Sequence, residues 1–362
     1  MSNTVRLVLS LCCAGFLAGG AMAEPINFTD EKGKTVTLEG PAERVVTIPI
    51  PAASVLIAVD GGTDHLVGMH PLSKTAIKNR PMGEFFPEAM AIPSDITPKG
   101  FTFVPNVEEL LALDPDLVFQ WGHLSDDIIA PIENAGLNVA TIRIGREEFT
   151  IKWLEMMGAA LGKPEKAQTM IDWRNETRQM LEEQTSQIPD EDRPRVLYLM
   201  NYLSKLRVAG GKSYNNFAMN LAGGKNVAED LGMFVDVGPE QILEWDPEII
   251  LLNGFEPGLT PQDVYDNPLF ADLTAVKDRR VYLMPMGGYR WDPPNHESPL
   301  SWLWQSMVFH PDKFNWPLRD MIDENYQFIY GHSVDSEMAD GILRMKANGD
   351  AANYGQFAAE PS

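Results

Sequence analysis

The sequence has little cysteine, little positive charge and few long apolar runs. Its two cysteines, Cys12 and Cys13, both lie near the N-terminus, and residues 14–362 contain none. The body of the protein therefore has no thiol nucleophile, no cysteine zinc site and no disulfide. Lys and Arg number 29 against 51 Asp and Glu, which gives a formal net charge of −22. A surface this acidic repels phosphate backbones and anionic lipid, which argues against nucleic acid or a lipid surface as a partner.

The N-terminal segment is typical of a secretory signal peptide. Arg6 precedes an apolar stretch from Leu7 to Ala18, and Ala21-Met22-Ala23 supplies the small residues that a signal peptidase requires. We expect cleavage after Ala23 and export of the rest of the chain. The alternatives are an uncleaved anchor, which needs an apolar run nearer to ~20 residues, and lipidation of a cysteine, which needs a small residue just ahead of it.

An internal repeat is the most informative feature of the remaining sequence. Segments 107–119 and 239–251 align without a gap, and each reads as a short helix, an Asp-Pro stop and a buried strand. Strands and helices alternate around both copies, which indicates βαβ units with mainly parallel sheets. Between the copies, the stretch from Pro164 to about Gln187 predicts one helix of roughly 34 Å.

These patterns predict an α/β protein of two Rossmann-like lobes, with mainly parallel sheets, joined by one long α-helix. We assign residues 24–147 to the N-terminal lobe, 148–192 to linker helices and 193–347 to the C-terminal lobe with its C-terminal helices. Residues 348–362 are predicted to form a disordered tail. A single long connecting helix predicts a stiff joint between the lobes.

Several motifs give the chain a family resemblance. They are Arg44-Val45-Val46, the block 106–118, the stretch 221–227 (LAGGKNV), the block around Glu240 and the stretch 273–282 (LTAVKDRRVY). With these motifs in this order, the chain resembles periplasmic substrate-binding proteins of the helical-backbone class. Those proteins deliver iron-siderophores, haem, cobalamin or metal ions to ABC importers.

The resemblance implies a periplasmic receptor that captures a chelated metal between its lobes and hands it to an ABC permease dimer in the inner membrane. An iron-siderophore is the favoured ligand, and a haem-like or cobalamin-like macrocycle is the alternative. The resemblance further implies a monomer that has no cofactor and is not an enzyme.

Glu108 and Glu240 occupy matching places near the N-termini of the two repeated helices. A carboxylate there is favoured by the helix dipole, which is the purely structural interpretation. In cobalamin-binding members, glutamates at matched positions contact arginines of the permease dimer. The resemblance therefore implies that Glu108 and Glu240 are a docking pair, one on each lobe, oriented by charge complementarity.

Candidate ligand contacts follow the predicted strands, because ligands of α/β sheets bind beyond the carboxyl ends of the strands. Flat rings suit a large, partly apolar chelate, and the resemblance places Phe103 and Phe234 where cobalamin-binding members carry tryptophans. Arg290 suits a ligand carboxylate or oxyanion, with a salt bridge to Asp292 or Glu297 as the alternative. The predicted contacts are His70, Phe103, Trp121, Tyr202, Phe234, Phe255, Tyr289, Arg290 and Trp291.

Two other functions fit parts of the sequence. A receptor for a free metal ion would need three or four converging histidine or carboxylate ligands, and His70 is the first candidate for such a ligand. The other is a periplasmic hydrolase or metalloenzyme on the same scaffold. The sequence carries no Gly-x-Ser-x-Gly elbow, P-loop or His-Glu-x-x-His motif that would support an enzyme.

Overall fold

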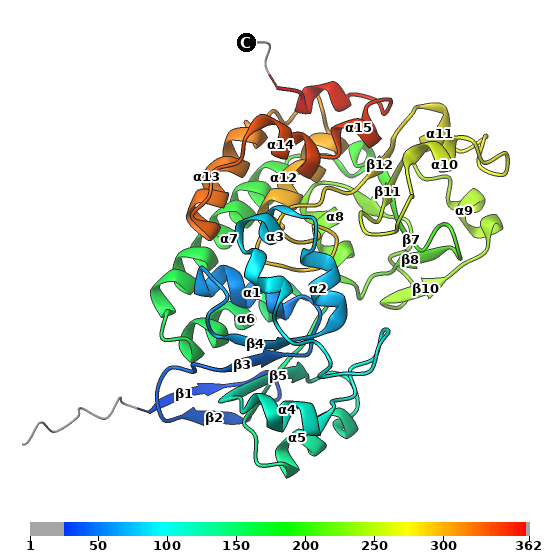
Figure 1. The fold of residues 1–362 in the computed structure, drawn as a ribbon. Helices are drawn as coiled ribbons and strands as arrows, with labels where there is room; N and C mark the ends of the chain where they lie inside the picture. Colours follow the sequence, from blue (N-terminus) through cyan, green and yellow to red (C-terminus); the bar gives the residue numbers. More distant parts are fainter. Residues whose placement is uncertain (1–24, 360–362) are drawn as a thin grey trace, which may run out of the picture.

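The N-terminal lobe is built on a four-stranded parallel sheet in the order β4–β3–β5–β6, with an antiparallel hairpin before it (Figure 1). The computed structural model describes residues 25–359, so the predicted signal peptide lies outside the described residues. Strands β3 and β5 are buried at every position, as expected for a sheet covered on both faces. The elements of this lobe are β1 (Ile26–Thr29), β2 (Thr35–Leu38), β3 (Val45–Thr47), α1 (Ala52–Asp60), β4 (Leu66–Met69), α2 (Pro71–Ile77), α3 (Pro81–Phe85), α4 (Val107–Leu113), β5 (Leu117–Trp121), α5 (Ala130–Asn134) and β6 (Val139–Ile142).

Two packed helices, α6 (Glu147–Ala160) and α7 (Pro164–Thr185), lead from this lobe to the next. Pro164 occupies the first turn of α7, where its missing N–H costs no hydrogen bond. With 22 residues, α7 is roughly 33 Å long. The long connecting helix that the sequence predicts is therefore present.

The C-terminal lobe carries a sheet in the order β10–β8–β7–β11–β12, with β9 paired to β7. The pairs β7–β11, β11–β12 and β7–β9 are parallel, whereas β8 pairs antiparallel with both β7 and β10. Its elements are β7 (Arg195–Met200), β8 (Arg207–Ala209), α8 (Tyr214–Leu221), β9 (Lys225–Asn226), β10 (Phe234–Asp236), α9 (Pro239–Trp245), β11 (Ile249–Leu252), α10 (Pro261–Tyr265), α11 (Thr274–Lys277), β12 (Val281–Leu283), α12 (Ser298–Phe309), α13 (Leu318–Tyr330), α14 (Ser336–Ile342) and α15 (Met345–Asn348).

Helix α12 lies at the centre of the packing between the lobes. All twelve of its residues are buried, including Trp302 and Trp304. It packs against α7, α8 and α13, and α13 in turn contacts α1 of the N-terminal lobe. Figure 1 shows α7, α12 and α13 side by side along one side of the molecule. The predicted two-lobe α/β fold is confirmed, and the joint between the lobes is a helical layer with α7 as one member.

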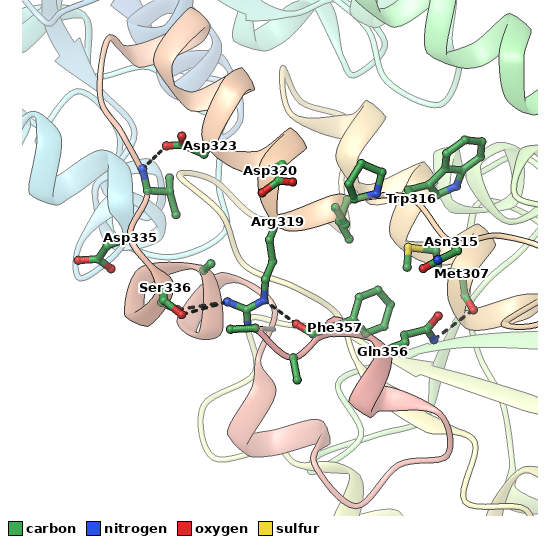
Figure 2. Close-up of a pocket in the computed structure, with 16 residues that line it drawn as sticks. Met307, Asn315, Trp316, Arg319, Asp320, Asp323, Asp335, Ser336, Gln356 and Phe357 are labelled. Atoms are coloured by element: carbon green, nitrogen blue, oxygen red, sulfur yellow. Dashed lines mark hydrogen bonds between the residues drawn. The ribbon is translucent and has the colours of Figure 1, made fainter. Parts of the chain in front are cut away.

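The chain after residue 348 is packed, and the prediction of a disordered tail is wrong for its described part. Tyr354 and Phe357 are buried, and the Tyr354 hydroxyl accepts a hydrogen bond from the Trp304 indole N–H at 3.1 Å. From α13, Arg319 Nε donates to the carbonyl of Phe357 at 2.7 Å (Figure 2). Two aromatic side chains bury enough apolar area to order this short segment.

The two repeated helices end in the same way. Asp114 after α4 and Asp246 after α9 both adopt left-handed backbone, with φ of 45° and 39°. Arg44 Nε donates to the carbonyl of Asp114 at 3.0 Å, and Arg195 Nη2 donates to the carbonyl of Asp246 at 2.8 Å. Each helix C-terminus is therefore fixed by an arginine from the strand region of its own lobe.

The acid that follows each Asp-Pro pair also has the same partner in both lobes. The Asp116 carboxylate accepts a hydrogen bond from the backbone N–H of Arg44 at 2.8 Å, and the Glu248 carboxylate accepts one from Arg195 N–H at 2.9 Å. The sequence repeat is thus also a structural repeat. In both copies, equivalent hydrogen bonds connect the end of a short helix to the arginine at the start of a strand of its own lobe.

Candidate ligand-binding site

A cavity of about 150 Å³ lies between the two lobes, and side chains from both lobes line it. Its walls are mainly apolar and aromatic, which is typical of small-molecule sites. Six of the nine predicted contacts line it: Phe103, Trp121, Phe234, Phe255, Tyr289 and Arg290. The expectation that the loops at the carboxyl ends of the strands share one cavity agrees with this arrangement.

The wall from the N-terminal lobe is a chain of edge-to-face aromatic rings. The ring centroids of Phe101 and Phe103 lie 5.2 Å apart, and those of Phe103 and Trp121 lie 6.0 Å apart. Gln120 Nε2 donates to the Phe103 carbonyl at 3.0 Å and fixes this loop to β5. Phe101 is 80% exposed although it lines the cavity. Sequence reasoning missed Phe101 because a phenylalanine in an irregular loop has no periodic signal.

The wall from the C-terminal lobe contains a buried carboxylate, Asp292, which the sequence suggested only as a partner for Arg290. It accepts hydrogen bonds from the Tyr198 hydroxyl at 3.1 Å and from the backbone N–H of Gly254 at 3.1 Å. Burial raises the pKa of Asp292 to about 6, against the opposing effect of these donors. Asp292 thus anchors β7 and the loop after β11 to the cavity wall.

Arg290 lies at the edge of the cavity with its guanidinium over the ring of Phe255, 4.4 Å from the ring centroid. Its Nε is buried and has no hydrogen-bond partner within residues 25–359. The alternative salt bridges to Asp292 and Glu297 do not form, because Asp292 is bound by Tyr198 and Gly254, and Glu297 accepts from Trp291 Nε1 at 2.6 Å. Arg290 therefore makes no direct ion pair among the described residues, although its charge acts on the nearby Asp292, and it lies beside aromatic rings.

His70 does not line the cavity, which corrects its prediction as a ligand contact and possible metal ligand. Its Nε2 donates to the carbonyl of Thr102 at 2.8 Å, and its Nδ1 accepts from the backbone N–H of Leu72 at 3.0 Å. Burial lowers the pKa of His70, which favours this neutral form. Both ring nitrogens are thus occupied, and the side chain caps α2 behind Phe103, whose ring centroid is 5.4 Å away.

Tyr202 and Trp291 also lie away from the cavity lining. The Tyr202 hydroxyl donates to the carbonyl of Asp263 at 3.1 Å and accepts from Asn267 Nδ2 at 2.8 Å, within the C-terminal lobe. Trp291 is 1% exposed and donates to the buried Glu297 carboxylate. Tyr202 follows β7 directly and Trp291 lies in the longer loop after β12, and the polar atoms of both side chains point toward internal partners.

The predicted docking pair is exposed on the two matched helices, Glu108 on α4 and Glu240 on α9. One turn further along, Leu111 and Leu243 are 50% and 40% exposed. Figure 1 shows α4 in one lobe and α9 in the other. Each lobe therefore presents a carboxylate and an apolar side chain in the same relative positions.

A larger hollow, of about 620 Å³, lies beside α13 and the C-terminal segment (Figure 2). Its prominent cation, Arg319, is already bonded to Phe357, Ser336 and Asp340. The cavity between the lobes is the better candidate, because its cation lacks a partner and both lobes contribute to it.

Residues 25–359 bring together no group of three or more histidine, cysteine, aspartate or glutamate side chains able to hold a metal ion. Over the same residues, no helix combines the length and the apolar character that crossing a bilayer requires.

Two lobes around a shared cavity, joined by a layer of helices, define a two-lobed ligand receptor. The family model of periplasmic binding proteins matches residues 53–286. The chain belongs to this family, whose members are transport receptors rather than enzymes.

Relatives align over most of the chain. It is similar to the molybdate-binding protein MolA of Haemophilus influenzae, with 25% identity over 92% of this chain and 99% of MolA. The Fe(3+)-citrate-binding protein YfmC of Bacillus subtilis is 22% identical over 70% of this chain and 76% of YfmC. Among solved structures, a periplasmic solute binding protein from Veillonella parvula has 31% identity and a TM-score of 0.81, covering 90% of this chain and 99% of its own.

Proposed function

We propose that this protein captures an iron-siderophore or a related metal chelate in the cavity between its lobes and delivers it to an ABC permease. One observation carries the proposal: the unpaired guanidinium of Arg290 lies at the edge of a cavity walled by aromatic rings from both lobes. Rings provide apolar contact and stacking for a flat chelate, and the guanidinium pairs with its negative charge. YfmC, named for a ferric chelate, provides a precedent among relatives.

The size of the cavity bears on the ligand. A volume of about 150 Å³ is below the roughly 300–1,000 Å³ that is common for drug-sized ligands. A siderophore-sized chelate therefore extends beyond it, toward the exposed Phe101 or past Arg290.

The test is a binding titration of the purified protein, followed by tryptophan fluorescence, because Trp121 lines the cavity. The probes are ferric catecholate, hydroxamate and hydroxycarboxylate chelates, haem, cyanocobalamin, molybdate and free Zn²⁺ or Mn²⁺. We expect a ferric chelate to bind at micromolar concentration or below, and Arg290→Ala to weaken it by about tenfold or more. Arg178→Ala is the control, because Arg178 is a partly exposed arginine of α7 that pairs with Glu148 and Glu182 and does not line the cavity. Stabilisation by Zn²⁺ or Mn²⁺ alone would contradict the proposal.

An oxyanion is the second candidate ligand. The similarity to MolA extends over nearly the whole of both chains, and a tetrahedral oxyanion fits a cavity of this volume without rearrangement. Binding of molybdate with no binding of any ferric chelate would favour this candidate over the first.

We infer that Glu108 and Glu240 contact arginines on the two halves of the permease. Their exposure and matched positions support this inference.

We further infer that residues 1–23 are removed on export, so that the mature monomer begins at Glu24 in the periplasm. The intact mass of protein recovered from a periplasmic fraction tests the cleavage site, and a mass that retains residues 1–23 would refute it.

A further inference from the structure

A second chamber, of about 480 Å³, adjoins the aromatic cavity, and Phe255 and Arg290 line both. Two further arginines line the chamber, Arg80 and Arg344. They come from separate parts of the fold: Arg80 lies between α2 and α3 of the N-terminal lobe, and Arg344 lies between α14 and α15. Both lobes therefore contribute a guanidinium to one space.

The three arginines have no acidic partner within 4.0 Å in the part of the chain that the structure describes. The carboxylate that lines the chamber, Glu256, accepts from the backbone N–H of Leu203 at 2.9 Å through Oε1, and its buried Oε2 has no hydrogen-bond partner among residues 25–359. The charge of Asp292 also acts on Arg290 and Arg344, so the three arginines share this region with one lining carboxylate, Glu256, and with the neighbouring Asp292.

Like charges repel one another in this chamber. Burial, followed by the charges of Arg344 and Arg290, lowers the pKa of Arg80 to about 10. The Nε atoms of both Arg290 and Arg344 are buried with no acceptor among residues 25–359. Arg344 is held in left-handed backbone (φ 56°), and its Nη2 donates to the Gly254 carbonyl at 3.1 Å. A left-handed non-glycine residue is costly, so the fold keeps Arg344 in place against this strain and against its burial, with the charge of Asp292 as an opposing, favourable effect.

We propose that Arg80, Arg290 and Arg344 form an anion subsite that binds the acidic groups of a multiply charged ligand whose apolar or metal-bearing part occupies the aromatic cavity. The inference rests on the proposed function and narrows it to chelates with at least two free oxyanion groups, of the hydroxycarboxylate type. Arg290 joins the two spaces, with its planar group over Phe255 and its N–H groups available to a carboxylate. Guanidinium groups bind carboxylates in this way because their forked N–H groups match two oxygens.

The experiment compares Arg80→Gln and Arg344→Gln with wild type and with Arg178→Gln as the control. Three probes are titrated: ferric citrate, a neutral ferric trihydroxamate, and inorganic molybdate. We expect each chamber variant to weaken ferric citrate by about tenfold or more, to leave the neutral chelate unchanged, and to flatten the salt dependence of binding. We also expect ligand-free Arg80→Gln to melt at a higher temperature than wild type, because it removes the repulsion of Arg80 by Arg344 and Arg290.

The outcomes separate this inference from the proposed function. Equal loss of the neutral chelate and of ferric citrate, or no loss of either, overturns the anion subsite while leaving a chelate receptor intact. If wild type binds molybdate and no ferric chelate, the iron-chelate function fails. The anion subsite then stands only if Arg80→Gln weakens molybdate. Arg80→Lys and Arg344→Lys keep the charge and guard against a folding defect, and circular dichroism checks each variant.

Discussion

Arg174 on α7 and Glu147 at the start of α6 form a bidentate ion pair, with Nε–Oε1 and Nη2–Oε2 distances of 2.7 Å, and neither side chain is accessible to solvent. Arg174 Nη1 also donates to the carbonyl of Asn295 at 2.6 Å, and Asn295 Nδ2 donates to the carbonyl of Arg290 at 2.7 Å. The linker is therefore connected by hydrogen bonds to the cation of the candidate site.

We predict that Arg174→Met destabilises the protein by about 3–5 kcal/mol, because it leaves the Glu147 carboxylate buried without its partner. The double variant Glu147→Met, Arg174→Met removes both charges and is expected to recover most of this loss. Denaturant unfolding measures both effects. If the double variant is as unstable as the single one, the cost does not come from an unpaired charge. Ligand affinity should fall in both variants, since both lose the bond to Asn295.

Asp292 gives the stability of the protein a defined pH dependence. Its pKa is about 6 in the folded protein, against 3.8 for an unperturbed aspartate. At a pH between these two values, the folded state therefore holds a proton that the unfolded state has lost. Stability contributed by this group is therefore greatest below pH 4 and falls as the pH rises to 6, by about 3 kcal/mol at most. Unfolding free energies measured from pH 4.5 to 7.5 test this. Asp292→Asn should flatten the slope in that window, and an unchanged slope would show that another group is responsible.

The docking pair is predicted to act separately from ligand binding. Reversing the charge in Glu108→Lys or Glu240→Lys should weaken binding to the cognate permease by at least about tenfold, roughly 1.4 kcal/mol. The dissociation constant of the ligand should stay the same. Binding of the receptor to permease in nanodiscs measures the first quantity, and titration measures the second. Glu183→Lys, on an exposed turn of α7, is the control, and a loss of the same size in that variant would indicate a general charge effect.

The C-terminal segment is predicted to contribute to global stability. Tyr354 is 1% exposed, its hydroxyl donates to the Leu343 carbonyl, and its ring packs against Trp304 with centroids 6.5 Å apart. Tyr354→Ala should therefore cost about 3 kcal/mol or more. Asn353→Gly alters the exposed neighbour, keeps the left-handed backbone of that position (φ 59°) and serves as the control. Equal midpoints for the two variants in denaturant would mean that the segment is not part of the cooperative unit.

The alternation of strands and helices was enough to predict the two lobes and the long helix, because those signals are local in the sequence. Six of the predicted contacts line one cavity, as expected because parallel strands end at the same edge of a sheet. His70 was placed at the correct strand end, but a capping bond within two residues decides which way its ring points. Such side-chain directions depend on hydrogen bonds that no periodicity records.

The arginine chamber could not be predicted for a different reason. Arg80 and Arg344 lie far apart in the chain, each at the start of a short helix, and only the packing of the two lobes brings them beside Arg290. Asp292 and Phe101 likewise stand in irregular loops. The prediction of a disordered tail is wrong for the described part of residues 348–362, because the burial of the Tyr354 and Phe357 rings outweighs the polar character of the residues around them.

The matched ends of α4 and α9 have a consequence for delivery. A permease built from two identical subunits has two equivalent docking surfaces. A receptor with the same carboxylate and leucine on each lobe can bind them in either of two orientations, related by a half-turn rotation of the receptor. Both docking orientations would then allow delivery, which makes the free energy of docking more favourable by about 0.4 kcal/mol. The neighbouring positions break the equivalence, since Glu109 of α4 corresponds to Gln241 of α9, and Ala112 corresponds to Glu244. These four residues would then decide whether the ligand always enters the importer with the same end first.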